Sequence, residues 1–150
     1  MRITKRTNIA FRILMYCAIH HDRLVTKSEI AARCNTSESH LAQVINHLAQ
    51  FGYLRTQRGR AGGLTLARPM ADIGVGEVFR RFEAPGAIVE CLGDIDKSCP
   101  LVAACRLRHA LADAAEAFHA HLDRLTLADL VCGNHALVDI IAPQACAGKA

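Results

Sequence analysis

The chain has 150 residues, of which 51% are hydrophobic and 21% charged, which suits one globular domain, or one small domain with an appendage, and excludes a disordered chain. No apolar run of about 18 residues and no signal-peptide core occur, so we expect a cytoplasmic protein with no membrane partner. The net charge of +4 is uneven: residues 1–68 carry eleven lysines and arginines against three acids, and residues 69–150 carry seven against eleven. A basic first half suggests a polyanion such as nucleic acid as partner, with a merely soluble basic surface as the alternative.

The first predicted element is a helix over residues 8–20. Its apolar residues occur on all sides, which indicates a largely buried helix. Thr7 or Asn8 could cap its N-terminus. Cys17 lies inside this stretch and is expected to be a core residue rather than a ligand.

Two further helices are predicted over residues 26–34 and 37–50, joined by a tight turn, and together they make a helix-turn-helix candidate. Thr26 and Glu29 have the spacing of a capping box at the start of the first. The second repeats apolar residues at helical spacing on one face, namely Leu41, Val44, Ile45 and Leu48.

The other face of the second helix is rich in uncharged hydrogen-bonding side chains, which suit the reading of base edges in a major groove. A plain solvated helix face is the alternative, but such a face more often carries glutamate and lysine. The residues of this unit that we expect to contact DNA are Thr36, Ser37, Ser39, His40, Gln43 and His47.

A β-hairpin is predicted next, with strands over residues 53–56 and 64–66 and the turn R-G-R-A-G-G between them. We interpret it as a wing, in which Arg58 and Arg60 point at phosphates or into a minor groove. The letters R-G-R also occur in ordinary loops, but directly after a helix-turn-helix they favour a wing. A helix over residues 74–83 follows the hairpin.

Three cysteines, Cys91, Cys99 and Cys105, lie within fifteen residues of one another. Because Pro100 suits the first turn of a helix, we expect Cys99 at a helix N-terminus and Cys105 inside that helix. The positive end of the helix dipole would stabilise thiolates there. The two Cys-x-x-Cys pairs of a typical structural zinc site are absent. The residues leave three interpretations open: a metal or iron–sulfur cluster, redox chemistry, or ordinary buried cysteines.

The longest periodic segment overlaps the last of these cysteines. Apolar side chains recur at alternating spacings of four and three, interrupted by one arginine, and form a heptad-like seam of Ala104, Arg108, Leu111, Ala115, Phe118, Leu122 and Leu125. A helix projecting from so small a domain needs a partner for this stripe. A second copy of the chain is the commonest partner, and packing onto the chain's own core is the alternative. We expect a short helix to follow, capped by residues 126–129. The chain is expected to be frayed from Pro143 onward.

On these motifs the chain resembles the winged-helix iron–sulfur repressors, the family that includes NsrR, IscR and RirA. The resemblance covers about residues 1–131 and is carried by M-R-I-T-K-R-T-N with Arg12, R-G-R-A-G-G-L-T-L-A, E-C at Cys91, C-P-L at Cys99, C-R-L at Cys105 and A-F-H-A-H-L-D-R-L-T-L-A-D-L-V. It implies a homodimer that holds one iron–sulfur cluster per subunit and represses genes at a palindromic operator on double-stranded DNA.

The resemblance also implies the ligands and the signal. Cys91, Cys99 and Cys105 would hold the cluster, expected as [4Fe-4S] with [2Fe-2S] as the alternative, whereas Cys17, Cys34, Cys132 and Cys146 would be dispensable. The E-C, C-P-L, C-R-L and T-L-A-D-L phrases look most like the nitric-oxide-sensing branch, in which the fourth ligand is sometimes an aspartate from the partner subunit. Asn8 stands at that position here, and a neutral amide is a poor iron ligand. The iron-responsive RirA-like branch also carries asparagine there, so iron or cluster status is the alternative signal.

We therefore expect a mainly α fold with a small β-wing. Its predicted parts are a winged helix-turn-helix DNA-binding domain over residues 1–83, a cluster-binding loop over 84–106, a dimerisation helix with a short terminal helix over 100–131, and a C-terminal tail over 132–150. The predicted function is transcriptional repression. A redox or cluster-carrier protein that does not bind DNA is the alternative, but it would need neither a wing nor a polar recognition helix. No nucleophile–base constellation or phosphate loop occurs, so no enzyme is expected.

Overall fold

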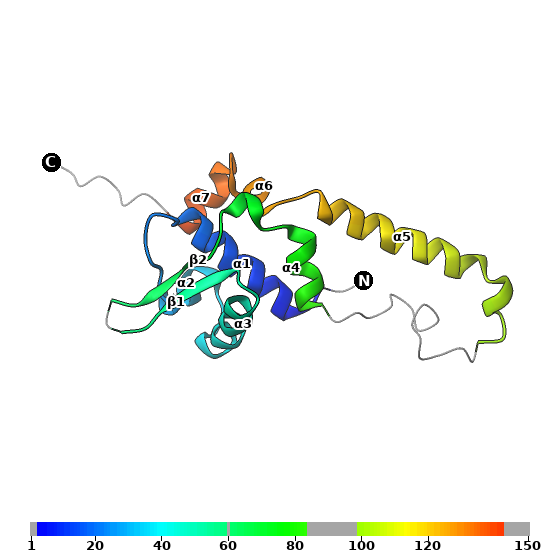
Figure 1. Cartoon of the computed structure of the whole chain (residues 1–150), viewed down its shortest axis with the longest axis horizontal. Helices are drawn as coiled ribbons and strands as arrows, with labels where there is room; N and C mark the ends of the chain where they lie inside the picture. The colour runs from blue at the N-terminus through cyan, green and yellow to red at the C-terminus, as the bar shows by residue number, and fades with distance from the viewer. Residues whose placement is uncertain (1–2, 60, 84–98, 143–150) are drawn as a thin grey trace.

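The computed structural model describes residues 3–59, 61–83 and 99–142, and it has the expected mainly α fold with a small β-wing (Figure 1). Its first part, which we call the winged part, contains α1 (Lys5–Ile19), α2 (Lys27–Cys34), α3 (Glu38–Gln50), β1 (Leu54–Gln57), β2 (Gly63–Leu66), a 3-10 helix (Met70–Asp72) and α4 (Val75–Phe82). The rest contains a 3-10 helix (Val102–Ala104), α5 (Arg106–Asp123), α6 (Leu127–Val131) and α7 (His135–Ile141). None of these helices has the length and apolar character needed to cross a membrane.

Helix α1 forms the centre of the fold. Its N-cap is Thr4, whose side chain accepts a hydrogen bond from the backbone N–H of Thr7, so the helix begins earlier than the predicted residue 8. Ile13 and Leu14 have no exposed surface, and the helix contacts α3, α6 and β2. Full burial of an aliphatic side chain of this size contributes about 1.5–3 kcal/mol, so each of these two residues stabilises the fold.

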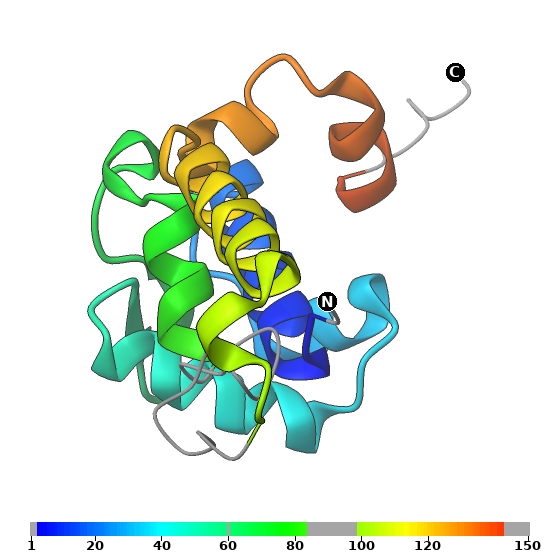
Figure 2. The ribbon, with the colours of Figure 1, turned by 90° about the vertical axis from the view of Figure 1, so that its right-hand side faces the viewer.

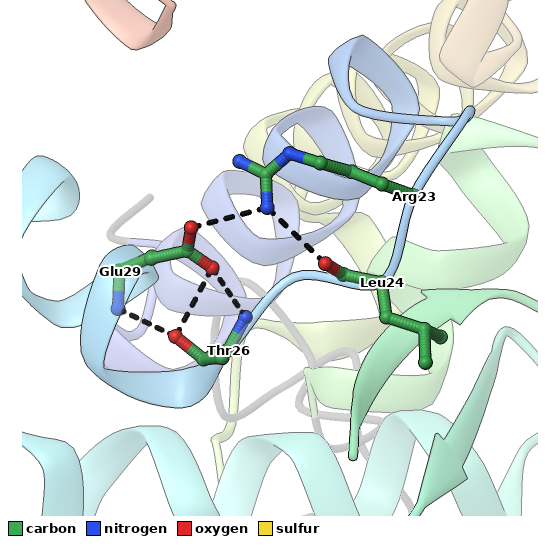
Figure 3. A network of polar contacts seen from close by, with 4 residues as sticks. All are labelled: Arg23, Leu24, Thr26 and Glu29. Carbon is green, nitrogen blue, oxygen red and sulfur yellow. Dashed lines mark hydrogen bonds and ion pairs between the residues drawn. The ribbon is translucent and has the colours of Figure 1, made fainter. Parts of the chain in front are cut away.

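Helices α2 and α3 form the predicted helix-turn-helix. Thr26 and Glu29 make the expected capping box, and the Glu29 carboxylate also pairs with Arg23 at 3.0 Å (Figure 3). Asn35 ends α2 in the left-handed conformation, with φ of 46°, which asparagine adopts more easily than most residues. The predicted inner face of α3 is buried, namely Leu41, Val44, Ile45 and Leu48.

The predicted wing is present as the antiparallel pair β1 and β2. Two backbone hydrogen bonds between Val25 and Leu64, of 3.0 and 2.8 Å, attach the hairpin to the segment before α2. A Cβ atom on Gly62 would lie 2.2 Å from the carbonyl oxygen of Gln57, so the turn can close this tightly only with glycine at that position.

Helix α5 extends away from the winged part and is attached to α4 near its C-terminal end (Figures 1 and 2). The backbone N–H of Val75 donates to the carbonyl of Leu125 at 2.8 Å. A Cβ atom on Gly76 would overlap the Asp123 side chain and approach its backbone nitrogen, so the junction needs glycine there. Arg80 pairs with the same Asp123 at 2.6 Å. The two helices are therefore joined by backbone, packing and charge at one end.

After α5 the chain returns to α1. Thr126 and Asp129 form a capping box at the start of α6, which is the short helix that the sequence predicts. Helix α7 then packs on α1 with Ile141 buried. Within residues 132–150, which were expected to form a C-terminal tail, residues 135–141 are helical and Asn134 caps them. The frayed end expected from residue 143 lies outside the described residues.

Candidate functional site

The outward face of α3 (Glu38–Gln50) presents most of the side chains predicted to read bases. The exposed ones are Ser37, Ser39, His40 and Gln43. Ser37 Oγ lies 2.8 Å from His40 Nδ1 and 3.3 Å from Ser39 Oγ. The start of the helix therefore carries a connected group of hydrogen-bonding atoms that solvent or a nucleic acid can reach.

Thr36 and His47, which were predicted to contact DNA with them, are only partly exposed. The Thr36 hydroxyl donates to the Cys34 carbonyl oxygen at 3.1 Å and so shapes the turn before α3. His47 Nδ1 lies 2.8 Å from Nη2 of Arg6 in α1, and the ring meets that of Phe82 in α4 edge to face. Both side chains are thus engaged within the protein.

Ion pairs remove negative charge from the surface of the helix-turn-helix. Glu38, in the first turn of α3, pairs with Lys27 at 2.9 Å and accepts a hydrogen bond from Ser28 at 2.8 Å. The hydrogen bonds from Lys27 and Ser28 hold the pKa of Glu38 below its usual value. The carboxylate of Glu29 is likewise paired, with Arg23. The remaining basic side chains therefore dominate the charge of this surface.

The wing adds arginine to that surface. Arg55 and Arg58 are exposed, and neither forms an ion pair within the part of the chain that the structure describes. A backbone hydrogen bond of 3.0 Å from Gly62 to Gly59 closes the turn next to Arg58. Arg60 lies outside the described residues. An exposed, unpaired arginine at a hairpin tip is suited to contact phosphate.

Two of the three predicted cluster ligands are described. Cys99 is exposed, and Cys105 is half-buried and forms the N-cap of α5 (Arg106–Asp123). The expected placement, with Cys99 at the helix N-terminus and Cys105 inside the helix, is corrected: Pro100 opens only a turn and a short 3-10 helix, closed by the 3.0 Å hydrogen bond from Ala104 to Leu101. Cys91 lies outside the described residues.

The surroundings of Cys105 suit a thiolate ligand. Cys105, the N-cap residue of α5, makes no side-chain hydrogen bond to the first turn of the helix, in which Arg106 and Arg108 stand. Cysteine thiolates are the usual protein ligands of iron–sulfur clusters, and both described cysteines are at least partly exposed. Within residues 3–59, 61–83 and 99–142, no three histidine, cysteine or acidic side chains are close enough to hold a metal ion. The two described cysteines fit thiolate ligation, and the predicted set of three also needs Cys91.

Cys17 and Cys34 have the opposite character. Cys17 is 1% exposed, and burial, with a smaller effect from Cys34, raises the pKa of its thiol to about 12. Burial also raises the pKa of Cys34, although Arg12 acts against it. A thiol that stays protonated is a poor ligand. Cys17 is therefore the core residue that the sequence predicts.

Asn8, the residue in the position of a possible fourth ligand, is exposed near the start of α1. It lines an open pocket of about 490 Å³ between the start of α1 and the turn that joins α2 to α3. Arg12, also on the pocket wall, donates to the Cys34 carbonyl at 2.8 Å and so ties α1 to the end of α2. The amide of Asn8 is accessible to a second chain.

One polar contact was missed from the sequence. Glu83, the last residue described before the cysteine segment, accepts hydrogen bonds from the backbone N–H of Thr4 at 2.8 Å and from the hydroxyl of Thr7 at 2.5 Å. Thr7 is fully buried. Two threonines three residues apart indicate an N-cap. Their partner Glu83 lies 79 and 76 residues further along the chain, so local spacing could not predict it.

Comparison with known proteins identifies the family. The model of the Rrf2 family, described as "Iron-dependent Transcriptional regulator", matches residues 3–133. The chain belongs to the Rrf2 family. It is 44% identical over 134 residues to the HTH-type transcriptional repressor NsrR of Streptomyces coelicolor. The aligned residues make up 87% of this chain and 88% of the relative. It is 40% identical over 132 residues to the HTH-type transcriptional regulator NsrR of Geobacillus kaustophilus. Here the aligned residues make up 87% of this chain and 90% of the relative.

Solved structures agree with this family. CymR, the global cysteine regulator of B. subtilis, superposes with a TM-score of 0.68 at 27% identity, covering 87% of this chain and 95% of CymR. IscR of T. potens superposes with a TM-score of 0.66 at 25% identity, covering 87% and 85%. The predicted winged-helix class and family resemblance are therefore confirmed. Because the relatives are transcriptional regulators, the expectation that this protein is not an enzyme is confirmed as well.

Proposed function

We propose that the protein is a cytoplasmic, DNA-binding repressor that acts as a homodimer at a palindromic operator and carries an iron–sulfur cluster. The observation that carries this proposal is the exposed polar face of α3 beside a basic wing. Membership of the Rrf2 family supports a role in transcription, and the name of the Streptomyces relative, a transcriptional repressor, supports repression.

In this proposal α3 enters the major groove. Ser39, His40 and Gln43 face base edges, where serine and glutamine donate and accept hydrogen bonds. Arg58 and Arg60 of the wing neutralise phosphates and contribute affinity that depends little on sequence. Dimers of helix-turn-helix proteins place two such helices about 34–36 Å apart on one face of DNA, which is why a palindromic operator accompanies a homodimer.

Helix α5 supports the homodimer. None of its residues is buried in the single chain, although the predicted seam is apolar. The Phe118 ring lies 5.3 Å from that of Phe79 in α4, so the chain's own core covers one end of the seam. Leu111 lies toward the other end and is only partly covered. A second copy of α5 would bury this remainder.

Cys91, Cys99 and Cys105 are the proposed ligands of the cluster, [4Fe-4S] or alternatively [2Fe-2S]. A bound cluster would supply iron that reacts with nitric oxide or is lost when iron is scarce. The chain would contribute three cysteine ligands and, through Asn8 from the partner subunit, an amide in place of a stronger carboxylate ligand. A weakly held fourth position would make the cluster sensitive to its surroundings.

Nitric oxide is the proposed signal, on the resemblance of the cysteine phrases to the nitric-oxide-sensing branch. Iron or cluster status is the second candidate. It is favoured by Asn8 and by the description of the family as iron-dependent regulators. In both cases the intact form binds the operator tightly and the altered form binds it weakly.

Anaerobic purification, absorption spectra and native mass would establish the cluster and the oligomer. Nitric-oxide titration followed by footprinting then tests the signal: we expect the intact form to protect an operator and the treated form to leave it open. If both forms protect the operator equally and iron chelation releases the protein from it, iron rather than nitric oxide is the signal. A cluster without any operator binding would favour the redox or carrier protein.

Two matched cysteine variants test the ligands. Cys99 and Cys132 are both exposed in the single chain. Cys99→Ala should abolish the cluster absorption, whereas Cys132→Ala should leave it unchanged. Loss of the cluster in both variants, or in neither, would contradict the proposed ligand set.

A further inference from the structure

Three helices meet where the winged part ends and the cysteine segment begins. The end of α3 contributes His47 and Phe51, the start of α1 contributes Arg6, and the end of α4 contributes Phe82, with Glu83 directly after it. We call these five residues the joint. They lie at the C-terminal end of the proposed recognition helix, away from the exposed serines at its start.

Aromatic rings hold the end of α3 against the end of α4. The centroids of Phe51 and Phe82 are 5.8 Å apart at 88°, and those of His47 and Phe82 are 6.4 Å apart at 74°. His47 and Phe51 are themselves stacked at 6.3 Å. Edge-to-face contacts of this kind are favourable because the positive ring edge meets a negative ring face. The orientation of α3 is thus coupled to the last turn of α4.

The contact between Arg6 and His47 fixes the state of the histidine. A guanidinium group can only donate, so the 2.8 Å contact from Arg6 Nη2 requires Nδ1 of His47 to accept, which leaves the proton on Nε2. Arg81 of α4 stacks over Phe51 at 5.4 Å, so the charged groups in and beside the joint are the basic Arg6 and Arg81 and the acidic Glu83.

Glu83 ties the same place to the start of α1. Burial acts to raise the pKa of Glu83, but the hydrogen bonds from Thr7 and Thr4 outweigh it and hold that pKa below the usual value. The ionised carboxylate also lies at the positive end of α1. The end of α4 is thereby bound to the helix that carries Arg6, which in turn holds His47. Contacts therefore run in a closed ring through α1, α3 and α4.

We propose that His47 is a positioning residue for DNA recognition, and that the joint passes changes in the cysteine segment to α3. This rests on the proposed DNA-binding function. His47 does not read a base in this proposal, because its Nδ1 is taken by Arg6 and its ring is packed against Phe82. Residues 84–98, which include Cys91, follow Glu83 directly in the sequence.

Variants can separate the two contacts of His47. His47→Asn keeps an acceptor close to the position of Nδ1 but removes the ring, whereas His47→Phe keeps a ring and removes the acceptor. His47→Ala removes both, and Arg6→Met removes the donor. Affinity would be measured for the operator and for a panel of its single-base-pair variants, at one salt concentration.

A positioning residue should lower affinity for every DNA in the panel by the same factor. We expect roughly a tenfold loss for His47→Ala, within the range typical of coupling between sites, and smaller losses for His47→Asn and His47→Phe. The double variant Arg6→Met/His47→Phe should bind DNA no more weakly than either single variant, because both substitutions remove the same hydrogen bond between Arg6 and His47. In ¹⁵N-labelled wild-type protein without DNA, the NMR chemical shift of His47 Nδ1 should be that of a ring nitrogen without a proton. This chemical shift should change in the Arg6→Met variant.

Glu29 supplies a matched control for the transmission of the signal. Glu83 accepts hydrogen bonds from Thr4 and Thr7 at the start of α1. Glu29 similarly accepts hydrogen bonds from Thr26 at the start of α2 (Figure 3) and belongs to no contact of the joint given above. Glu83→Gln should reduce the difference in operator affinity between cluster-containing and cluster-free protein, and Glu29→Gln should preserve it. An equal response in the two variants would overturn the role of the joint in transmission.

Two further results are decisive for His47. If His47→Ala relaxes the preference at one base pair and leaves the other affinities unchanged, His47 is a base reader and this inference is overturned while the proposed function stands. If the wild-type protein shows no preference for an operator over random DNA, the proposed function fails and the inference fails with it. A uniform loss in His47→Ala, partly rescued in His47→Asn, is the result that supports it.

Discussion

Helix α1 in the winged part and helix α5 are of similar length but differ in how they are packed. α1 (Lys5–Ile19) has eight buried residues and contacts α2, α3, α4, α6 and α7, whereas α5 (Arg106–Asp123) has no buried residue in its 18. Leu107 near the start of α5 is 65% exposed. Helix α1 therefore lies in a packed core to which α6 and α7 also contribute, whereas α5 has an apolar stripe that the described residues cover where it meets α4.

The junction between these two regions holds the C-terminal end of α5 in place. Its C-terminal end is held by Arg80, by the close approach at Gly76 and by the backbone contact to Val75. Toward its start it has little packing from the described residues. Helical stability in proteins comes mostly from packing of an apolar face, so the free end of α5 is where a second chain would contribute most.

The largest expected effect is on assembly. Leu111→Asp would place an unpaired charge in the proposed dimer seam, which costs about 3–5 kcal/mol when such a charge is buried. We choose Leu111 over Phe118, because Phe118 also packs on Phe79 within the chain. Sedimentation equilibrium should show monomers, and operator affinity should fall because a monomer covers one half-site.

Leu107→Asp is the control for that change. It introduces the same charge on the same helix, but at an exposed position outside the heptad-like seam. A protein that stays dimeric with Asp at 107 and becomes monomeric with Asp at 111 supports the seam. The reverse pattern would move the interface to another face of α5.

The next effect compares the two regions by stability. Leu48 in α3 has no exposed surface, so Leu48→Ala should leave a cavity and lower the free energy of unfolding by about 2–5 kcal/mol. Leu107→Ala should change it by about 0.5 kcal/mol or less. Denaturant titrations at one protomer concentration would compare them, and similar losses would show that α5 is buried more fully than the single chain indicates.

Elements with a local signal were predicted well from the sequence. The capping boxes at Thr26 and Thr126 depend on a residue three positions away, and the wing depends on adjacent glycines. The start of α1 was placed too late, although its cap is local: the Thr4 side chain accepts a hydrogen bond from the backbone N–H of Thr7. The further partner of both threonines, Glu83, is distant in sequence. Apolar spacing alone could not reveal that partner.

The candidate site was predicted in part for the same reason. Residue type and helical spacing placed Gln43 and its neighbours on an outer face, and they are exposed. His47 occupies the same face by spacing, yet Arg6 and Phe82 from two other helices engage it. Helix α7 escaped prediction because its burial depends on α1. The partial exposure of His47 and the packing of α7 therefore depend on tertiary contacts, which local spacing does not show.

A smaller effect concerns the outer face of the winged part. Gln43→Ala should cost about 1–3 kcal/mol on the operator and relax the preference at one base pair. Arg58→Ala should weaken binding to all DNA and reduce the slope of affinity against salt concentration by about 1. Binding isotherms at several salt concentrations would distinguish them, and the same response from both variants would contradict the division between base and phosphate contacts.

The smallest effect is the acid sensitivity of the winged part. The backbone hydrogen bond from Thr26 lowers the pKa of Glu29, with further lowering by the Thr26 hydroxyl and Arg23 that together outweigh burial. A carboxyl group whose pKa is lowered on folding stabilises the folded state above the ordinary glutamate value of 4.5, and this contribution is lost as the pH falls through the lower folded-state pKa. Glu29→Gln should therefore be less stable than the wild type at pH 7, and the two unfolding free energies should converge toward pH 3. Asp123→Asn, which breaks the pair with Arg80 at the junction of α4 and α5, should instead weaken the attachment of α5 and leave the winged part unchanged. Urea titrations across this pH range, followed by hydrogen exchange in α1 and α5, would test both expectations. A Glu29→Gln difference that stays constant down to pH 3 would mean that the side-chain charge of Glu29 does not contribute to folding.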